Sequence, residues 1–271
     1  MEMPGRIPVA ENLSRVKRKI AIISGKGGVG KSTVAANLAL GLAMEGKQVG
    51  LLDLDLHGPN IPKLLGVEDK LLTIEDNKIK PVLLGENLKI VSVGFLLKEK
   101  GTPIIWRGPI KMRAIEQLLG EVDWGDCDYL IIDLPPGTGD EALSLVQLIG
   151  KLDGFIVVTT PQEVALLDVE KAVNFAKELN IPIIGIIENM SGFKCPHCGN
   201  EINLFGKNGG KEAAQKWNLN FLGQIPFDPQ IVEWSDKGLS FLRHAPHSEA
   251  SKTFSNVIEF LLKEGWVTEK H

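Results

Sequence analysis

Cysteine and excess positive charge are both scarce in this sequence. Only three cysteines occur in 271 residues, whereas a disulfide framework uses more of them in a shorter chain, so disulfides are not expected to stabilise the fold. Lysine and arginine total 30 against 34 aspartates and glutamates, which gives a formal net charge of −4. A mildly acidic chain offers no general attraction for nucleic acid, and we expect no nucleic-acid partner.

Long hydrophobic runs are also missing. No stretch approaches the roughly 20 apolar residues that a membrane-spanning helix needs. The N-terminal lead-in, residues 1–18, is polar and charged, and it lacks the apolar core of a secretory signal. We therefore expect a cytoplasmic protein with no membrane partner.

What the sequence does contain is an alternation of buried-strand and helix patterns. Short apolar runs that suit strands buried on both faces occur at 19–24, 48–53, 88–93, 128–133, 154–159, 182–187 and 220–225. Helical spacing of apolar residues occurs at 31–45, 109–119, 139–150, 163–179, 206–217 and 254–262, and a hairpin is expected within 71–84. This order predicts an α/β fold: one domain over residues 19–265, with a mostly parallel sheet and helices on both faces.

The strongest motif is a complete G-x-x-x-x-G-K-[ST] phosphate loop between the first strand and the first helix. Its glycines let the backbone curl so that N–H groups point at phosphates, and the helix N-terminus adds partial positive charge. Lys31 would contact the β- and γ-phosphates, and the Ser32 hydroxyl would ligate Mg²⁺. The predicted nucleotide-binding residues are Gly25, Lys26, Gly27, Gly28, Val29, Gly30, Lys31, Ser32 and Thr33.

Acidic residues follow two of the predicted strands. Asp53 and Asp55 end the second strand, and Asp133 ends the apolar run from Tyr129, which is the Walker B pattern. Ligands of open α/β sheets bind at the carboxyl ends of strands. Carboxylates at that edge can orient an attacking water or hold the hydration shell of Mg²⁺.

Two of the three cysteines form a metal-knuckle sequence, Cys195-Pro-His-Cys198, followed by a glycine that permits a tight turn. Two thiolates do not complete a zinc or 4Fe–4S site, which usually takes four ligands. A two-fold dimer could bring two pairs together. Alternatively His244 and His247 could complete a zinc site, or the pair could be a redox dithiol. Cys127 stands alone and is expected to be a small buried residue.

Taken together, these motifs resemble one family. Lys26 is typical of the deviant Walker A group of dimer-forming ATPases. The order of the motifs over about residues 15–262 closely resembles the Mrp (ApbC-like) iron–sulfur cluster carrier ATPases. The segments that carry the resemblance are Gly25–Thr33, Asp53–Pro62, Trp106–Pro109, Asp133–Asp140, Glu188–Met190 and Cys195–Cys198.

The resemblance implies roles for individual residues. Lys26 would reach across a homodimer to the partner's nucleotide, so that Lys26, Lys31 and Asp55 form the catalytic set. Asp55 would orient the attacking water, Asp53 would lie nearer the metal, and Asn189 would read the adenine edge. An amide suits that task because it both donates and accepts hydrogen bonds.

The resemblance also implies the cargo and the partners. Cys195 and Cys198 of each subunit would bridge a labile 4Fe–4S cluster, with zinc as the alternative occupant. The chain would bind ATP with Mg²⁺, hydrolyse it slowly, and exchange the cluster with assembly factors and apo acceptor proteins. Two other functions remain open at this point: a positioning ATPase that binds membrane or DNA, and a zinc-bridged ATPase scaffold.

Overall fold

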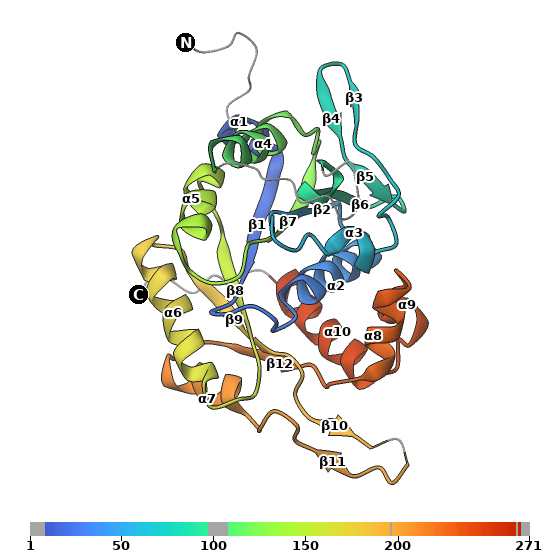
Figure 1. The fold of residues 1–271 in the computed structure, drawn as a ribbon, viewed down its shortest axis with the longest axis vertical. Helices are drawn as coiled ribbons and strands as arrows, with labels where there is room; N and C mark the ends of the chain where they lie inside the picture. The colour runs from blue at the N-terminus through green and yellow to red at the C-terminus, as the bar shows by residue number, and fades with distance from the viewer. Residues whose placement is uncertain (1–8, 97–107, 196, 264, 267–271) are drawn as a thin grey trace.

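The computed structural model describes residues 9–96, 108–195, 197–263 and 265–266, with only the backbone of 108–111. Within these residues, eight strands form one sheet in the order β12-β9-β8-β1-β7-β2-β6-β5 (Figure 1). Every neighbouring pair is parallel except β5 and β6, which are antiparallel. The strands are β1 (Val16–Ile23), β2 (Val49–Asp53), β5 (Val82–Leu84), β6 (Leu88–Ser92), β7 (Cys127–Asp133), β8 (Gly154–Thr159), β9 (Ile183–Glu188) and β12 (Phe221–Gln224).

Two small hairpins project from this body at opposite ends of the molecule (Figure 1). One pairs β3 (Thr73–Glu75) with β4 (Lys78–Lys80), and the other pairs β10 (Phe193–Lys194) with β11 (Glu201–Ile202). The second hairpin carries the predicted cysteine pair at its turn. The cysteines therefore lie outside the main sheet, on a projection that follows β9.

Helices cover both faces of the sheet because successive strand residues point to opposite sides. In β1, Ile20 and Ile22 belong to one core and Ala21 and Ile23 to the other. The first core contains α2 (Lys31–Met44), α9 (Phe241–His244) and α10 (Glu249–Leu262), with α3 (Ile61–Leu64) and α8 (Pro229–Asp236) beside them. The second contains α4 (Gly108–Glu121), α5 (Asp140–Ile149), α6 (Ala165–Glu178) and α7 (Gly209–Lys216), and α1 (Val9–Asn12) packs on α4.

The predicted α/β fold is confirmed, with local differences. The first strand begins at Val16 rather than at residue 19, because Leu13 and Val16 are apolar and buried in the core. The hairpin expected within 71–84 forms only over 73–80, and Val82–Leu84 instead joins the main sheet as its antiparallel edge. No helix in the described residues is long and apolar enough to span a bilayer.

Candidate functional site

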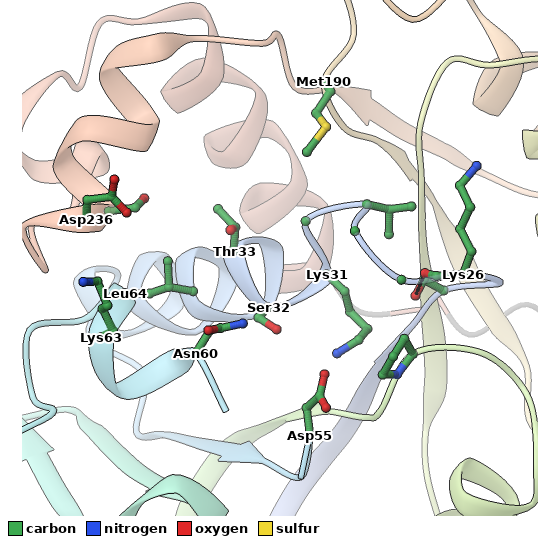
Figure 2. A pocket seen from close by; sticks show the side chains of 17 residues that line it. Lys26, Lys31, Ser32, Thr33, Asp55, Asn60, Lys63, Leu64, Met190 and Asp236 are labelled. Atoms are coloured by element: carbon green, nitrogen blue, oxygen red, sulfur yellow. Dashed lines mark hydrogen bonds between the residues drawn. The ribbon is translucent and has the colours of Figure 1, made fainter. Parts of the chain in front are cut away.

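The phosphate loop lies where the sequence places it, between β1 and the N-terminus of α2, and it lines a cavity of about 480 Å³ (Figure 2). Gly28 and Gly30 have φ values of 78° and 83°, which residues with a Cβ rarely adopt. A Cβ on Gly30 would also lie 2.1 Å from the Asn189 side-chain nitrogen. Because both backbone angle and space exclude a side chain here, the loop is held in the curled shape that a phosphate requires.

Sheet register brings the predicted acidic residues together. Asp53 of β2 lies beside Asp133 of β7 and beside Ser92 of β6, so all three groups meet at the carboxyl edge. The Lys31 ammonium reaches down from α2 and donates a hydrogen bond of 2.5 Å to Asp133. Both members of this ion pair are buried, so removing either one would leave the other without a compensating charge.

Burial controls the charge of these carboxyl groups. Loss of solvation, and then the nearby Asp133, raise the pKa of Asp53 to about 8, although Ser92 donates a hydrogen bond of 2.8 Å to it. Burial also raises the pKa of Asp133, while Lys31 and the Ser32 hydroxyl oppose that shift. Two adjacent carboxyl groups with one ammonium form a site that a further positive charge would stabilise.

The donor set fits Mg²⁺. The Oδ2 atom of Asp133 is buried and has no hydrogen-bond partner among the described residues. The Ser32 hydroxyl lies near enough to this carboxyl group to lower its pKa, and hard oxygen ligands of this kind are what Mg²⁺ prefers. Ser32 would ligate the ion and Asp133 would hold its water shell, and the bound ion would neutralise charge on the phosphates.

Asp55 faces the same cavity from the loop after β2, and Figure 2 shows it near Lys31 and Ser32. Its Oδ1 atom accepts hydrogen bonds from the backbone N–H groups of His57 and Gly58, at 3.1 and 3.2 Å. These bonds fix the carboxyl group in a tight turn. One of its oxygens is thereby held in place at the cavity wall, which is the geometry needed to orient a water molecule.

Lys26 does not point into its own cavity. Its ammonium group turns away from Lys31 (Figure 2) and forms an ion pair of 2.9 Å with Asp168 of α6 and a hydrogen bond of 3.2 Å with Gln162. The Lys26 side chain remains 34% exposed. The ammonium group of Lys26 is therefore held at the rim of the cavity by residues of its own chain.

Asn189 contacts the phosphate loop directly. Its side-chain nitrogen donates a hydrogen bond of 2.9 Å to the Val29 carbonyl oxygen. It also lines a second cavity of about 240 Å³, next to the first, whose walls include Ile225, Pro226 and Phe227. Asn189 therefore braces the phosphate loop with one of its two amide hydrogens.

The cysteine pair lies at the turn of the β10–β11 hairpin. The Gly199 N–H donates to the Cys195 carbonyl oxygen and the Cys195 N–H donates to the Asn200 carbonyl oxygen, both at 2.9 Å. Backbone N–H groups of Cys198 and then His197 hold the pKa of the Cys195 thiol below its usual range. Cys198 is exposed and Cys195 is partly exposed. The turn thus favours a thiolate and leaves it open to a metal from outside.

The positions of Cys127 and His244 bear on how the metal site at the cysteine pair could be completed. Cys127 is buried, as predicted, and burial raises its pKa to about 11. The described residues contain no group of three or more His, Cys, Asp or Glu side chains that could hold a metal ion. The His244 ring instead packs beside Trp234, so the zinc site with His244 and His247 does not form within one chain. Trp106 and Arg107 of the quoted motif lie outside the described residues.

Sequence patterns assigned no role to several residues at this edge. Lys26 is held by Asp168, in the first turn of α6, and by Gln162, in the turn before that helix, and neither residue belongs to a motif. Met190 lines both cavities, and it has a positive φ of 58°. Glu188 is fully buried and accepts three hydrogen bonds. A glutamate that ends a completely apolar strand was the available signal for this last residue.

Comparison with known proteins agrees with this geometry. The family model described as NUBPL iron-transfer P-loop NTPase, of the ParA group, matches residues 15–262. A curated relative from Methanocaldococcus jannaschii, named iron-sulfur cluster carrier protein, is 50% identical over 94% of this chain and 88% of its own length. A protein of the same name from Saccharolobus solfataricus is 48% identical over 95% of this chain and 87% of its own.

Solved structures share the fold. A nucleotide-binding protein from Archaeoglobus fulgidus, in complex with ADP and with cobalt, is 42% identical and superposes with a TM-score of 0.75 over 85% of this chain and 90% of its own. The septum site-determining protein MinD from Pyrococcus horikoshii, complexed with Mg-ADP, is 27% identical with a TM-score of 0.65 over 92% and 97%. The phosphate loop, its buried acidic partners and these matches over most of the chain place this protein in the NUBPL iron-transfer P-loop NTPase family.

Proposed function

We propose that this protein is an ATP-dependent iron–sulfur cluster carrier. The observation that carries the proposal is the presence, in one chain of this family, of a complete phosphate loop and a solvent-accessible cysteine pair in which the pKa of the Cys195 thiol is lowered. Thiolates are the ligands of iron–sulfur clusters, and an exposed position suits a cargo that must be passed on. The close relatives that bear the name of cluster carrier support the same activity.

A homodimer supplies the missing ligands. Cys195 and Cys198 give two thiolates, and a second copy related by a two-fold axis gives two more, which completes a 4Fe–4S cluster. Exposed apolar side chains lie on the elements that border Lys26 and the cysteine hairpin, which is consistent with a contact surface there. These side chains are Val164, Leu167, Ile202 and Leu204. In this dimer Lys26 leaves Asp168 and contacts the partner's nucleotide.

The hydrolytic step uses the residues at the carboxyl edge. Lys31 and the loop N–H groups bind the β- and γ-phosphates, and Asp55 orients the water that attacks the γ-phosphate. Asp53 lies near the Mg²⁺ position, and Asp133 holds the water shell of the ion. The cluster then passes to apo acceptor proteins, and hydrolysis is slow and coupled to that transfer. We place this activity in the cytoplasm.

A membrane-bound positioning ATPase is the less favoured alternative. MinD is among the structural neighbours, but here the apolar face of α10, the last described helix, is already packed into the core. Its buried residues include Phe254, Val257, Ile258 and Leu261. That face has no apolar surface left for a lipid interface.

The direct test is the iron, sulfide and zinc content after anaerobic purification and reconstitution, together with the mass of the assembly. About two iron and two sulfide per chain in a dimer are expected for one shared 4Fe–4S cluster. Zinc at about half an ion per chain, with no cluster after reconstitution, would point to a zinc-bridged scaffold and contradict the proposal.

A further inference from the structure

The residues between the nucleotide pocket and the cysteines form a direct physical connection. We use the name cysteine segment for residues 191–210, which leave the sheet after β9 and return at the start of α7. Glu188 and Asn189, at the end of β9, are adjacent in the chain and contact different parts of the molecule. One contacts the two ends of the cysteine segment, and the other contacts the phosphate loop.

Glu188 fixes both ends of the cysteine segment. Its Oε1 atom accepts a hydrogen bond of 2.6 Å from the Ser191 hydroxyl, at the first residue of the segment. Its Oε2 atom accepts one of 2.6 Å from the Gly210 N–H, at the last residue. Gln224 of β12 donates a third bond, of 2.8 Å, and also contacts Asn208 at 3.2 Å. The carboxyl group is fully buried, so each of these bonds is made away from water.

Close packing leaves Glu188 little freedom. A Cβ on Gly210 would lie 3.0 Å from the Glu188 Cβ and 3.0 Å from a methyl group of Thr159. A side chain at position 210 would therefore have to displace these neighbours by a few tenths of an ångström. A small shift of the Glu188 side chain must change the position of Gly210, Ser191 or both.

Asn189 connects the same strand end to the nucleotide. Its side chain holds the Val29 carbonyl of the phosphate loop at 2.9 Å. The next residue, Met190, lines the nucleotide cavity and is held at a φ of 58°, a conformation that is costly for a residue with a side chain. Nucleotide entry that moves the loop or Met190 therefore acts on the backbone that carries Glu188.

A second contact runs in parallel. Phe227 lines the cavity beside the phosphate loop, and its ring packs against Phe193 and Phe205 of the cysteine segment at centroid distances of 6.1 and 6.4 Å. The segment is thus held by one buried carboxyl group, by one aromatic cluster and by backbone hydrogen bonds at Ser191, Gly192 and Gly209. The carboxyl group and the aromatic cluster border the residues that face the nucleotide.

We propose that Glu188 and Asn189 form a relay in which Asn189 responds to the nucleotide-bound phosphate loop and Glu188 repositions the cysteine segment. Glu188 is a positioning residue: it touches neither nucleotide nor metal. The relay rests on the proposed function only for the identity of the cargo. Coupling of this kind is reciprocal, so metal at the cysteines must also change nucleotide affinity by the same factor.

The test uses metal-free, reduced protein in a Cys127→Ala background, so that a chromogenic aromatic disulfide reports only Cys195 and Cys198. The labelling rate is measured with and without Mg-ADP. ADP is chosen because it lacks the γ-phosphate that a partner's Lys26 would contact, so dimer formation does not shield the thiols. In the otherwise unchanged chain the rate should change about fivefold or more.

The Glu188→Gln variant keeps the shape of the side chain and replaces one hydrogen-bond-accepting oxygen with an NH₂ donor, which cannot accept from the donors that face it. Its ratio of rates with and without nucleotide should fall to about one, while its ADP affinity stays within about threefold. A purely structural role would alter both rates and leave their ratio intact. The matched control is Glu212→Gln, an exposed position on α7, which should keep the full ratio.

Either of two results overturns the relay: no nucleotide effect in the unchanged chain, or an undiminished ratio in folded Glu188→Gln. If Glu188→Gln does not fold, Ser191→Ala removes one of the three donors and should lower the ratio, and an unchanged ratio there counts against the relay. If labelling depends on nucleotide but the chain takes up no iron, the relay is supported and the cluster cargo is contradicted. If the chain takes up iron but labelling does not depend on nucleotide, the cargo is supported and the relay is contradicted.

Discussion

The nucleotide pocket and the cysteine hairpin are built on opposite principles. The pocket places ionisable groups inside the protein: Lys31, Asp53 and Asp133 are all buried, and neighbouring elements fix their positions. The hairpin places its reactive groups outside, on two short strands of two residues each. Burial strengthens electrostatic interactions and makes each group costly to remove, whereas exposure allows exchange with a partner. The predictions below test this contrast, from the largest expected effect to the smallest.

Lys31→Ala should have the largest effect. ATP turnover should fall more than about 1,000-fold, because the phosphates lose their main positive partner. Asp133 also loses its ion pair, so the unfolding free energy should fall by about 3–5 kcal/mol. Turnover is followed by phosphate release and stability by denaturant titration. The double variant Lys31→Met, Asp133→Asn should regain stability without regaining turnover, and restored turnover would contradict the assignment.

Lys26→Ala should lower turnover by about 100- to 1,000-fold while ADP affinity stays nearly unchanged. The reason is that this ammonium faces Asp168 at the rim and would act on a partner's nucleotide. Mixing Lys26→Ala with a Lys31→Ala chain provides a sharper check. In the mixed dimer the partner's Lys26 can reach an intact phosphate loop, so part of the activity should return, and no recovery at any mixing ratio would exclude action across the dimer.

Cys195→Ala should remove the cluster and leave the pocket intact. Iron after reconstitution should fall from about two per chain to about a tenth of that, because one thiolate per chain cannot complete the site. ADP affinity, measured by calorimetry, should stay within about twofold. Cys127→Ala is the matched control and should keep its iron, since that thiol is buried away from the hairpin. Full iron in Cys195→Ala would rule out the bridging arrangement.

Asp53 should make stability depend on pH. Its pKa is raised to about 8, so between about pH 4 and 8 the folded protein holds a proton that the unfolded chain releases. Stability therefore falls as pH rises through this window, by up to about 1.4 kcal/mol per pH unit from this residue. In Mg²⁺-free buffer, denaturant titrations of Asp53→Asn should show a flatter slope than the unchanged chain. An identical slope would mean that Asp53 is ionised in the fold.

Glu201→Gln should have the smallest effect. Glu201 lies on the hairpin and forms an exposed ion pair of 3.6 Å with Lys207. Water and salt screen such pairs, so the unfolding free energy should change by no more than about 0.5 kcal/mol. Compared with the Asp53 result, this measurement distinguishes the effect of a carboxyl group's charge on stability from the effect of its burial. A loss of unfolding free energy as large as that for a buried ion pair would contradict the difference drawn between the pocket and the hairpin.

The sequence predicted the pocket better than its surroundings. The phosphate loop, Asp53, Asp55 and Asp133 could be located because each follows a strand, and parallel strands bring such ends to one edge. The short helices α1, α3, α8 and α9 were missed because four to eight residues leave little periodicity, although α7, which also has eight residues, was predicted at 206–217. For α8, however, Asp228 caps the helix and Pro229 starts it, which is a recognisable signal.

Sequence patterns could not predict the contacts between helices, strands and loops. The pattern showed that β9 ends in Glu188 and Asn189, but a buried carboxyl group that joins residues 191 and 210 depends on how the chain returns to the sheet. The same holds for Lys26, whose partners on α6 and in the turn before it follow from packing alone. The edge strand Val82–Leu84 was misassigned because it continues the apolar pattern of the hairpin before it.

The closure of the cysteine segment at a single carboxyl group has one further consequence, for evolution and for protein engineering. A loop whose two ends meet at one point can change its length or its content without moving the strands that carry it. Residues 192–209 are therefore a segment that can be exchanged if the replacement supplies apolar side chains where Phe193 and Phe205 pack on Phe227. A metal-binding hairpin from another protein, grafted between Ser191 and Gly210, should fold on this sheet and come under the same nucleotide control.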